Sequence, residues 1–84
     1  MFYVYLIQST LFADKKYIGL TDNLRERLET HNSGGSLHTK SYRPWTLITF
    51  LGFNDKHQAA AFEKYLKSGS GRAFAKRRFW GNTD

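Results

Sequence analysis

Residues 2–31, FYVYLIQSTLFADKKYIGLTDNLRERLETH, decide the fold of this chain. Residues 2–8 form an apolar run rich in β-branched and aromatic side chains, which predicts a strand that is apolar on both faces. Residues 9–15 are expected to be a loop, and residues 16–20 predict a second strand. The spacing therefore predicts an antiparallel hairpin whose loop is longer than a two-residue turn.

Residues 22–31 predict a helix. Asp22 can cap its first turn, because a carboxylate accepts hydrogen bonds from the unpaired amides there. A stripe of leucines gives this helix a packing face, whereas Arg27 and His31, four residues apart, share a different face. Two glycines at residues 34–35 can adopt positive φ and are expected to end the helix.

The rest of the chain predicts one more strand and two more helices. Residues 32–44 form a long irregular segment, and such segments are usually functional or mobile. Residues 45–53 are rich in threonine, leucine, isoleucine and phenylalanine and predict a third strand. A capping-box spacing at residues 55–58 begins a helix that residues 68–71 break, and residues 72–80 predict a short basic helix.

Length favours one small domain over residues 1–84. The succession of elements predicts an α+β fold, a three-stranded antiparallel sheet flanked by three helices in the order ββαβαα. A chain of 84 residues buries roughly 60–65% of its unfolded surface, and 40% hydrophobic content supplies the core. The absence of cysteine excludes a disulfide, a thiolate zinc site and a cysteine nucleophile. No run approaches the ~20 apolar residues of a membrane span, so we expect no membrane partner and a cytoplasmic location. The oligomeric state stays open.

The net charge is +6, and its distribution is uneven. No acidic residue occurs between Thr30 and Asn54, and after Glu63 only Asp84 is acidic. Such asymmetry is typical of proteins that bind a polyanion such as nucleic acid. The alternative is a basic surface that serves solubility and has no partner.

Several spaced residues together resemble a known family. Tyr3–Tyr5 and Tyr17–Gly19, followed by Arg27, His31 and Glu63, resemble the signature of the GIY-YIG nuclease superfamily. The similarity is greatest to its small single-domain bacterial branch and to the N-terminal domain of an excision-repair endonuclease. The resemblance implies a metal-dependent endonuclease that hydrolyses phosphodiester bonds in DNA, with DNA repair as the expected process.

The two tyrosines are the residues that the resemblance places nearest the attacking water. It implies that Tyr5 acts as general base and that Tyr17 donates a hydrogen bond to the phosphate or to the water. The residues alone leave open which phenol takes the proton. The alternative for each is structural, because tyrosines on a small sheet usually pack in the core or across strands.

Arg27 and His31 are the expected phosphate contacts. A guanidinium can hold two phosphate oxygens and stays charged, and an imidazole can relay a proton near neutral pH. The alternative for both is solvated helix surface. Arg25 is the neighbouring candidate, but it points about 200° away around the helix, so both arginines are not expected at one phosphate.

Glu63 is the expected ligand of one divalent cation, Mg²⁺ or Mn²⁺. The resemblance makes it the single protein ligand, and Mg²⁺ commonly binds one or two carboxylates together with water and substrate phosphates. Such a metal stabilises the leaving oxygen. The alternative is an ion pair with Lys67, four residues later on the same helix.

Other cations and one aromatic residue are expected to hold the phosphate backbone without reading bases. These nucleic-acid-binding candidates are Arg25, Lys40, Tyr42, Arg43, Lys67, Arg72, Lys76 and Arg77. Trp45 or Tyr42 could stack an unpaired base. Because no recognition domain is expected, structure-specific, flap or single-stranded DNA is the predicted substrate, with RNA as an alternative.

Two other functions compete with the nuclease. Some members of the superfamily carry a lysine where this chain has Leu20, and several carry a late asparagine that Asn82 does not match convincingly. Both departures favour a nucleic-acid-binding module that has lost turnover. The third hypothesis is a protein-interaction domain whose basic face docks an acidic partner.

Overall fold

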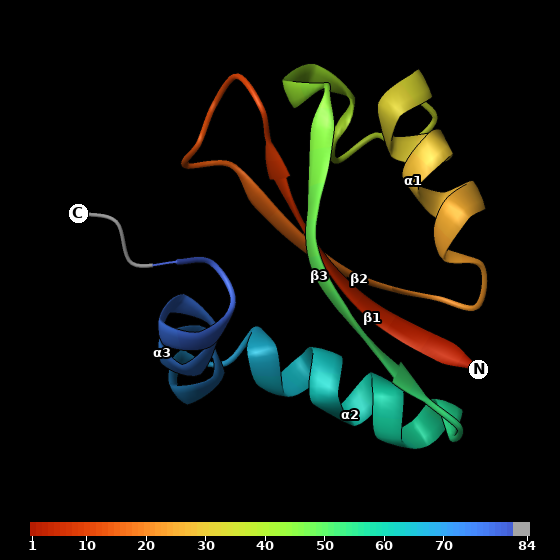
Figure 1. Cartoon of the computed structure of the whole chain (residues 1–84), viewed down its shortest axis with the longest axis vertical. Coiled ribbons are helices and arrows are strands. Elements are labelled where there is room, and N and C mark those ends of the chain that lie inside the picture. Colours follow the sequence, from red (N-terminus) through yellow and green to blue (C-terminus); the bar gives the residue numbers. More distant parts are fainter. Residues whose placement is uncertain (82–84) are drawn as a thin grey trace.

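The computed structural model describes residues 1–81, and Asn82 lies outside them (Figure 1). The predicted order ββαβαα and the α+β class are confirmed. The strands are β1 (Phe2–Ser9), β2 (Lys16–Thr21) and β3 (Trp45–Phe53). The helices are α1 (Leu24–Ser33), α2 (Lys56–Leu66) and α3 (Gly69–Arg78), with a single 3-10 turn, η1, at Lys40–Tyr42.

The three strands form one antiparallel sheet in the order β2-β1-β3, so β1 is the central strand. Tyr5 pairs with Gly19 of β2 on one side and with Phe50 of β3 on the other. The register with β3 shifts between Leu6 and Ile7. A central strand needs apolar side chains on both faces, which is the pattern that its sequence shows.

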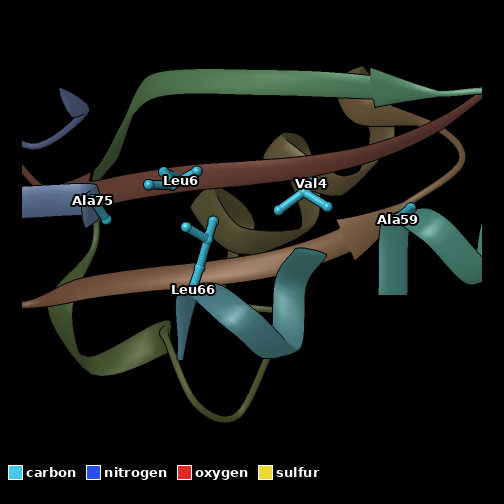
Figure 2. Packing of buried hydrophobic residues seen from close by; sticks show 5 residues of the cluster. All are labelled: Val4, Leu6, Ala59, Leu66 and Ala75. Atoms are coloured by element: carbon cyan, nitrogen blue, oxygen red, sulfur yellow. The ribbon is translucent and has the colours of Figure 1, made fainter. Parts of the chain in front are cut away.

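Helices cover both faces of the sheet, as Figure 1 shows, with α1 on one side and α2 and α3 on the other. Val4 and Leu6 of β1 point toward α2 and α3, where they form an apolar cluster with Ala59, Leu66 and Ala75 (Figure 2). The intervening side chains of β1 point toward α1. Alternation along β1 therefore separates two cores, one on each face.

Helix α1 corrects one expectation and confirms another. Its N-cap is Asn23 and not Asp22. The side-chain oxygen Oδ1 of Asn23 accepts from the backbone amide of Glu26 at 3.1 Å, and the backbone amide of Asn23 donates to Thr21 Oγ1. At its C-terminus Gly34 has φ +87°, as the glycines predicted. The face that Arg27 and His31 share lies only about 60° around the helix from the leucine stripe, and both side chains contact Tyr5 of the sheet.

Helix α3 begins three residues earlier than predicted and ends before Trp80. Ser68 caps it by accepting from the Gly71 amide at 3.2 Å, so Gly69–Gly71 belong to this helix. Gly71 is buried, and a Cβ on it would collide with the carbonyl group of Tyr65 at the end of α2. The break between the two helices is confirmed, and its glycine permits their close contact.

Candidate active site

Two tyrosines and a histidine gather on the face of the sheet that α1 covers. Tyr5 pairs with Gly19, two residues beyond Tyr17, so both phenols project from the same side of the hairpin. The Tyr5 ring centroid lies 6.3 Å from that of Tyr17 and 5.6 Å from that of His31. The rings of Tyr17 and His31 are 5.2 Å apart. The predicted convergence of these residues is therefore present in the structure.

Gly19 allows the Tyr5 ring to lie against β2. A Cβ at this position would collide with Oη and Cζ of Tyr5. The expected close approach at Gly19 is confirmed, and the group that approaches is the phenol on the neighbouring strand. Any larger residue would displace Tyr5 from the site.

A chain of hydrogen bonds runs from Arg27 through the buried residues. Arg27 Nε donates to Tyr5 Oη at 3.3 Å, Tyr5 Oη lies 2.8 Å from His31 Nε2, and His31 Nδ1 lies 2.7 Å from Thr39 Oγ1. Since a guanidinium can only donate, the phenol proton is directed to His31 Nε2. His31 Nδ1–H then donates to Thr39, which assigns the tautomer of a neutral imidazole.

Ionisation favours the same assignment. Burial raises the pKa of Tyr5, although the hydrogen bond and charge of Arg27 oppose the shift. Burial, and then the Arg27 cation, lowers the pKa of His31 below its usual value. Both residues are completely buried, so each is neutral at neutral pH and held in place by its partners.

Arg27 is the partly exposed cation of this cluster. Its hydrogen bond to Tyr5 is the main cause that raises its pKa, and Tyr17 contributes as well. It lines a pocket of about 300 Å³ together with Leu20 and Lys56. Lys56 was missed in the sequence, and it supplies a positive charge beside Leu20, the position where some members of the resembled superfamily carry a lysine.

Glu63 lies on α2. Its negative charge is the smallest of the causes that raise the pKa of Tyr5. Its side chain is 22% exposed and pairs with Lys67 Nζ at 3.0 Å, the ion pair considered as an alternative. Within residues 1–81 no three His, Asp or Glu side chains gather to bind a metal. The donor set therefore fits an ion that takes one carboxylate, with water and phosphate completing its shell.

Lys67 and Arg72 are the predicted nucleic-acid contacts that lie beside the cluster. They line a pocket of about 380 Å³ with Tyr17, together with Lys16 and Trp80, which the sequence did not single out. The other helical candidates lie away from it. Lys76 and Arg77, on α3, are exposed. Arg25 lines a separate hollow on α1, and Tyr17 is not part of its lining.

The segment between α1 and β3 is attached to the site through Thr39. This threonine contacts His31 through its hydroxyl and accepts from Trp45 Nε1 through its carbonyl oxygen at 2.8 Å. Trp45 is only 6% exposed, so the suggestion that it stacks a base is wrong. No local pattern around Thr39 predicted its contact with His31, because the two residues meet only when the segment folds back.

The remaining candidates lie in this segment, and Tyr42 packs against the buried cluster that contains Tyr5. The Tyr42 ring packs edge-on against Phe12 at 5.5 Å, with Lys15 Nζ over its face. Arg43 Nε donates to the Lys40 carbonyl oxygen at 2.9 Å. Lys40 and Arg43 are exposed, whereas Tyr42 is half-buried, so the two cations are accessible and the tyrosine is largely packed.

Comparison with known proteins gives the family. A sequence model described as the GIY-YIG catalytic domain matches residues 1–78. The chain belongs to the GIY-YIG family. Across the described residues 1–81, no helix of this GIY-YIG chain is long and apolar enough to cross a membrane.

Its relatives include small bacterial proteins and part of a larger eukaryotic one. A UPF0213 protein of Clostridium perfringens is 35% identical over 68 residues, which cover 80% of this chain and 71% of that protein. A UPF0213 protein of Pediococcus pentosaceus is 41% identical over 68 residues, 79% of this chain and 68% of that protein. A structure-specific endonuclease subunit SLX1 homolog of Giardia intestinalis is 35% identical over 65 residues, 73% of this chain but 18% of its own length. Membership of this GIY-YIG family supports a nuclease.

Proposed function

We propose that this protein is a divalent-metal-dependent endonuclease that hydrolyses phosphodiester bonds in DNA. The carrying observation is the hydrogen-bonded group of Arg27, Tyr5 and His31 beside Tyr17. A fixed cation next to a phenol suits a reaction in which negative charge develops on a phosphate. The relatives named structure-specific endonuclease subunits support cleavage directed by DNA structure rather than by base sequence.

The two phenols have different roles in this proposal. Tyr5 has no exposed surface and already accepts from Arg27, so it positions the guanidinium. Tyr17 is partly exposed and lines a pocket, so an attacking water molecule can reach its hydroxyl group. As the water oxygen bonds to phosphorus, Tyr17 Oη takes a proton from the water while its own hydroxyl proton passes to solvent. The ester P–O bond breaks, and the leaving oxygen takes a proton from solvent.

Arg27 and Glu63 divide the remaining work. Arg27 uses Nε to hold Tyr5, and the terminal nitrogens of its guanidinium can donate to phosphate oxygens. Lys56 lines the same pocket and adds a positive charge, which the carboxylate of Asp22, also in the lining, opposes. Glu63 would hold Mg²⁺ or Mn²⁺, which when bound supplies charge neutralisation at the leaving oxygen.

A cleavage panel tests the proposal. Labelled single-stranded, duplex, flap and branched DNA, together with RNA, are incubated with Mg²⁺, Mn²⁺ or EDTA. The Glu63→Gln and Tyr17→Phe variants are compared with matched exposed controls, Glu29→Gln and Tyr65→Phe, which remove the same groups elsewhere. We expect metal-dependent cleavage that both site variants reduce at least about 100-fold and that both controls retain.

The same panel can reject the nuclease. Cleavage that survives Glu63→Gln would mean that the carboxylate has no metal role or that a contaminant cuts the DNA. Cleavage of every substrate at one rate would reject the structure-specific substrate.

A binding module without turnover is the second candidate, and one contact favours it. Lys67 Nζ already pairs with Oε2 of Glu63 at 3.0 Å, so this cation competes with a metal for the carboxylate. This candidate predicts DNA retardation at low salt with no cleavage at any metal concentration. The nuclease predicts instead that Lys67→Gln, which frees the carboxylate, lowers the metal concentration needed for cleavage.

A further inference from the structure

The pocket beside Tyr17 is lined mostly by residues that have no role in the proposed cleavage reaction. It has a volume of about 380 Å³ and is bordered by β2, the end of α2, the start of α3 and the residues after α3. Part of its lining is apolar and consists of Ile18, Trp80 and the buried Leu66. Lys16 and Arg72, both exposed, contribute positive charge. Apolar and cationic surfaces in one small pocket suit a ligand that is flat and apolar at one end and anionic at the other.

We propose that this pocket binds one unpaired nucleotide of the DNA strand next to the scissile phosphate. Trp80 stacks on its base, and Lys16, Lys67 and Arg72 contact its phosphates. The inference rests on the proposed function and deepens it, because Tyr17 lines this pocket and belongs to the reacting cluster. A strand that passes Tyr17 with its phosphate at Arg27 must place a neighbouring nucleotide close to this pocket.

Trp80 is the tryptophan that can stack. Trp45 is buried with its indole N–H bonded to Thr39, whereas Trp80 is partly exposed and lines the pocket. Lys16 Nζ lies 5.7 Å from the Trp80 ring centroid, so a cation now covers the indole face. Lys16 is exposed and its stem is flexible, so it can move to a phosphate while a base takes its place on the ring.

The pocket favours an unpaired base over a duplex. Its volume lies near the lower limit of small-ligand sites, which matches one base rather than a base pair. A base within a duplex has both faces covered by its neighbours, so it cannot stack on Trp80 without leaving the helix. Lys67 connects this pocket with the proposed metal ligand, because its ammonium group also pairs with Glu63. The pocket would therefore select flaps, frayed ends and single strands.

Binding measurements in EDTA test this inference without requiring cleavage. Fluorescence anisotropy is recorded with labelled oligothymidylate, with the same strand carrying abasic spacers in place of its bases, and with a blunt hairpin duplex. The variants are Trp80→Ala, Trp80→Phe and Lys16→Gln. The control is Lys64→Gln, which removes an exposed lysine of α2 outside the pocket. Circular dichroism and thermal unfolding check that each variant is folded, because Trp80 also packs against the core.

The wild type should bind the thymine strand about ten-fold more tightly than the abasic strand, as one stacked base contributes. Trp80→Ala should remove most of this preference, Trp80→Phe should keep it, and duplex binding should change less than about two-fold. Lys16→Gln should reduce the salt slope for the single strand by about 0.7, and Lys64→Gln should leave the base preference intact.

Three results would overturn the pocket assignment. One is an equal affinity of the wild type for the thymine and abasic strands. Another is an equal loss for duplex and single strand in Trp80→Ala, and the third is a loss of base preference in Lys64→Gln. Absence of cleavage in the earlier panel would reject the nuclease alone, since these binding results are obtained without metal.

Discussion

The two faces of the sheet differ in chemistry although they share the central strand. Toward α2 and α3, the buried cluster consists of aliphatic side chains with no polar atom, including Val4, Leu6 and Leu66. Toward α1, the fully buried side chains include Tyr5 and His31, whose polar atoms are joined by hydrogen bonds. The first face stabilises the fold by removing apolar surface from water. The second contains, in addition to apolar side chains, a buried network of hydrogen-bonded polar groups.

This difference indicates how a small chain can contain both a core and a site. Burial without a partner is costly for a phenol or an imidazole, and within residues 1–81 no buried side-chain polar atom lacks a hydrogen-bond partner. The network is therefore ordered before any substrate binds. We expect substitutions on the aliphatic face to change stability alone, and substitutions on the polar face to change activity.

The largest expected effect is on the polar face. Arg27→Ala should lower the cleavage rate about 1000-fold, or ~4 kcal/mol, because it removes the cation at the phosphate and the donor to Tyr5. Single-turnover cleavage of the best substrate measures this loss. Arg25→Ala is the matched control and should stay within a few-fold of wild type. Equal losses in both variants would mean that Arg27 acts only through general electrostatics.

Leu6→Ala tests the aliphatic face. We expect a loss of roughly 2–5 kcal/mol in the free energy of unfolding, since a completely buried side chain leaves a cavity between β1 and α2. Urea denaturation measures it. Cleavage per folded molecule should be unchanged, and a large fall would show that the two faces are not independent.

Tyr5→Phe should affect both properties, but less. It leaves His31 Nε2 and Arg27 Nε without their partner, at a cost of about 1–3 kcal/mol in unfolding free energy. Cleavage should fall about ten-fold, because Arg27 is held less firmly. Tyr65→Phe, on the exposed side of α2, is the control for the loss of a hydroxyl group. A cleavage loss equal to that of Tyr17→Phe would indicate that Tyr5 itself takes the proton.

The smallest expected effect is a pH dependence of stability from His31. Its pKa is lowered in the folded protein by burial and by Arg27, so the unfolded chain binds more protons. This contribution is complete above the unfolded pKa of about 6.5 and is lost as pH falls toward the folded pKa. Urea unfolding between pH 5 and pH 8 should show stability rising with pH. In His31→Gln this part of the slope should be absent, and an unchanged slope would assign it to other groups.

Much of the fold could be predicted because its signals are local. The apolar alternation of residues 2–8, the glycine after α1 and the serine and glycines at the start of α3 each act within one or two turns of chain. Errors occurred where neighbouring residues compete for one role. Asn23 caps α1 in place of Asp22, and Ser68 begins α3 before Arg72.

The sequence named some of the side chains that the structure brings together and missed others. Tyr5, Tyr17, Arg27 and His31 were named because their types and order resemble a family signature, and the structure places them side by side. Thr39, Lys56 and Trp80 carry no such signal. They lie in different parts of the chain, and their positions beside the site follow from how the segment between α1 and β3, helix α2 and the residues after α3 pack on the sheet.

The sequence by itself determined the order of elements, the apolar central strand and the residue types available for phosphate chemistry. Only the tertiary structure decided that Tyr5 is fully buried and hydrogen-bonded to Arg27. It also decided that Trp80, and not Trp45, borders the pocket beside Tyr17. The physical reason is the range of the interactions. Periodicity and capping depend on residues within a few positions, whereas exposure depends on which distant side chains cover a given atom after the chain has packed.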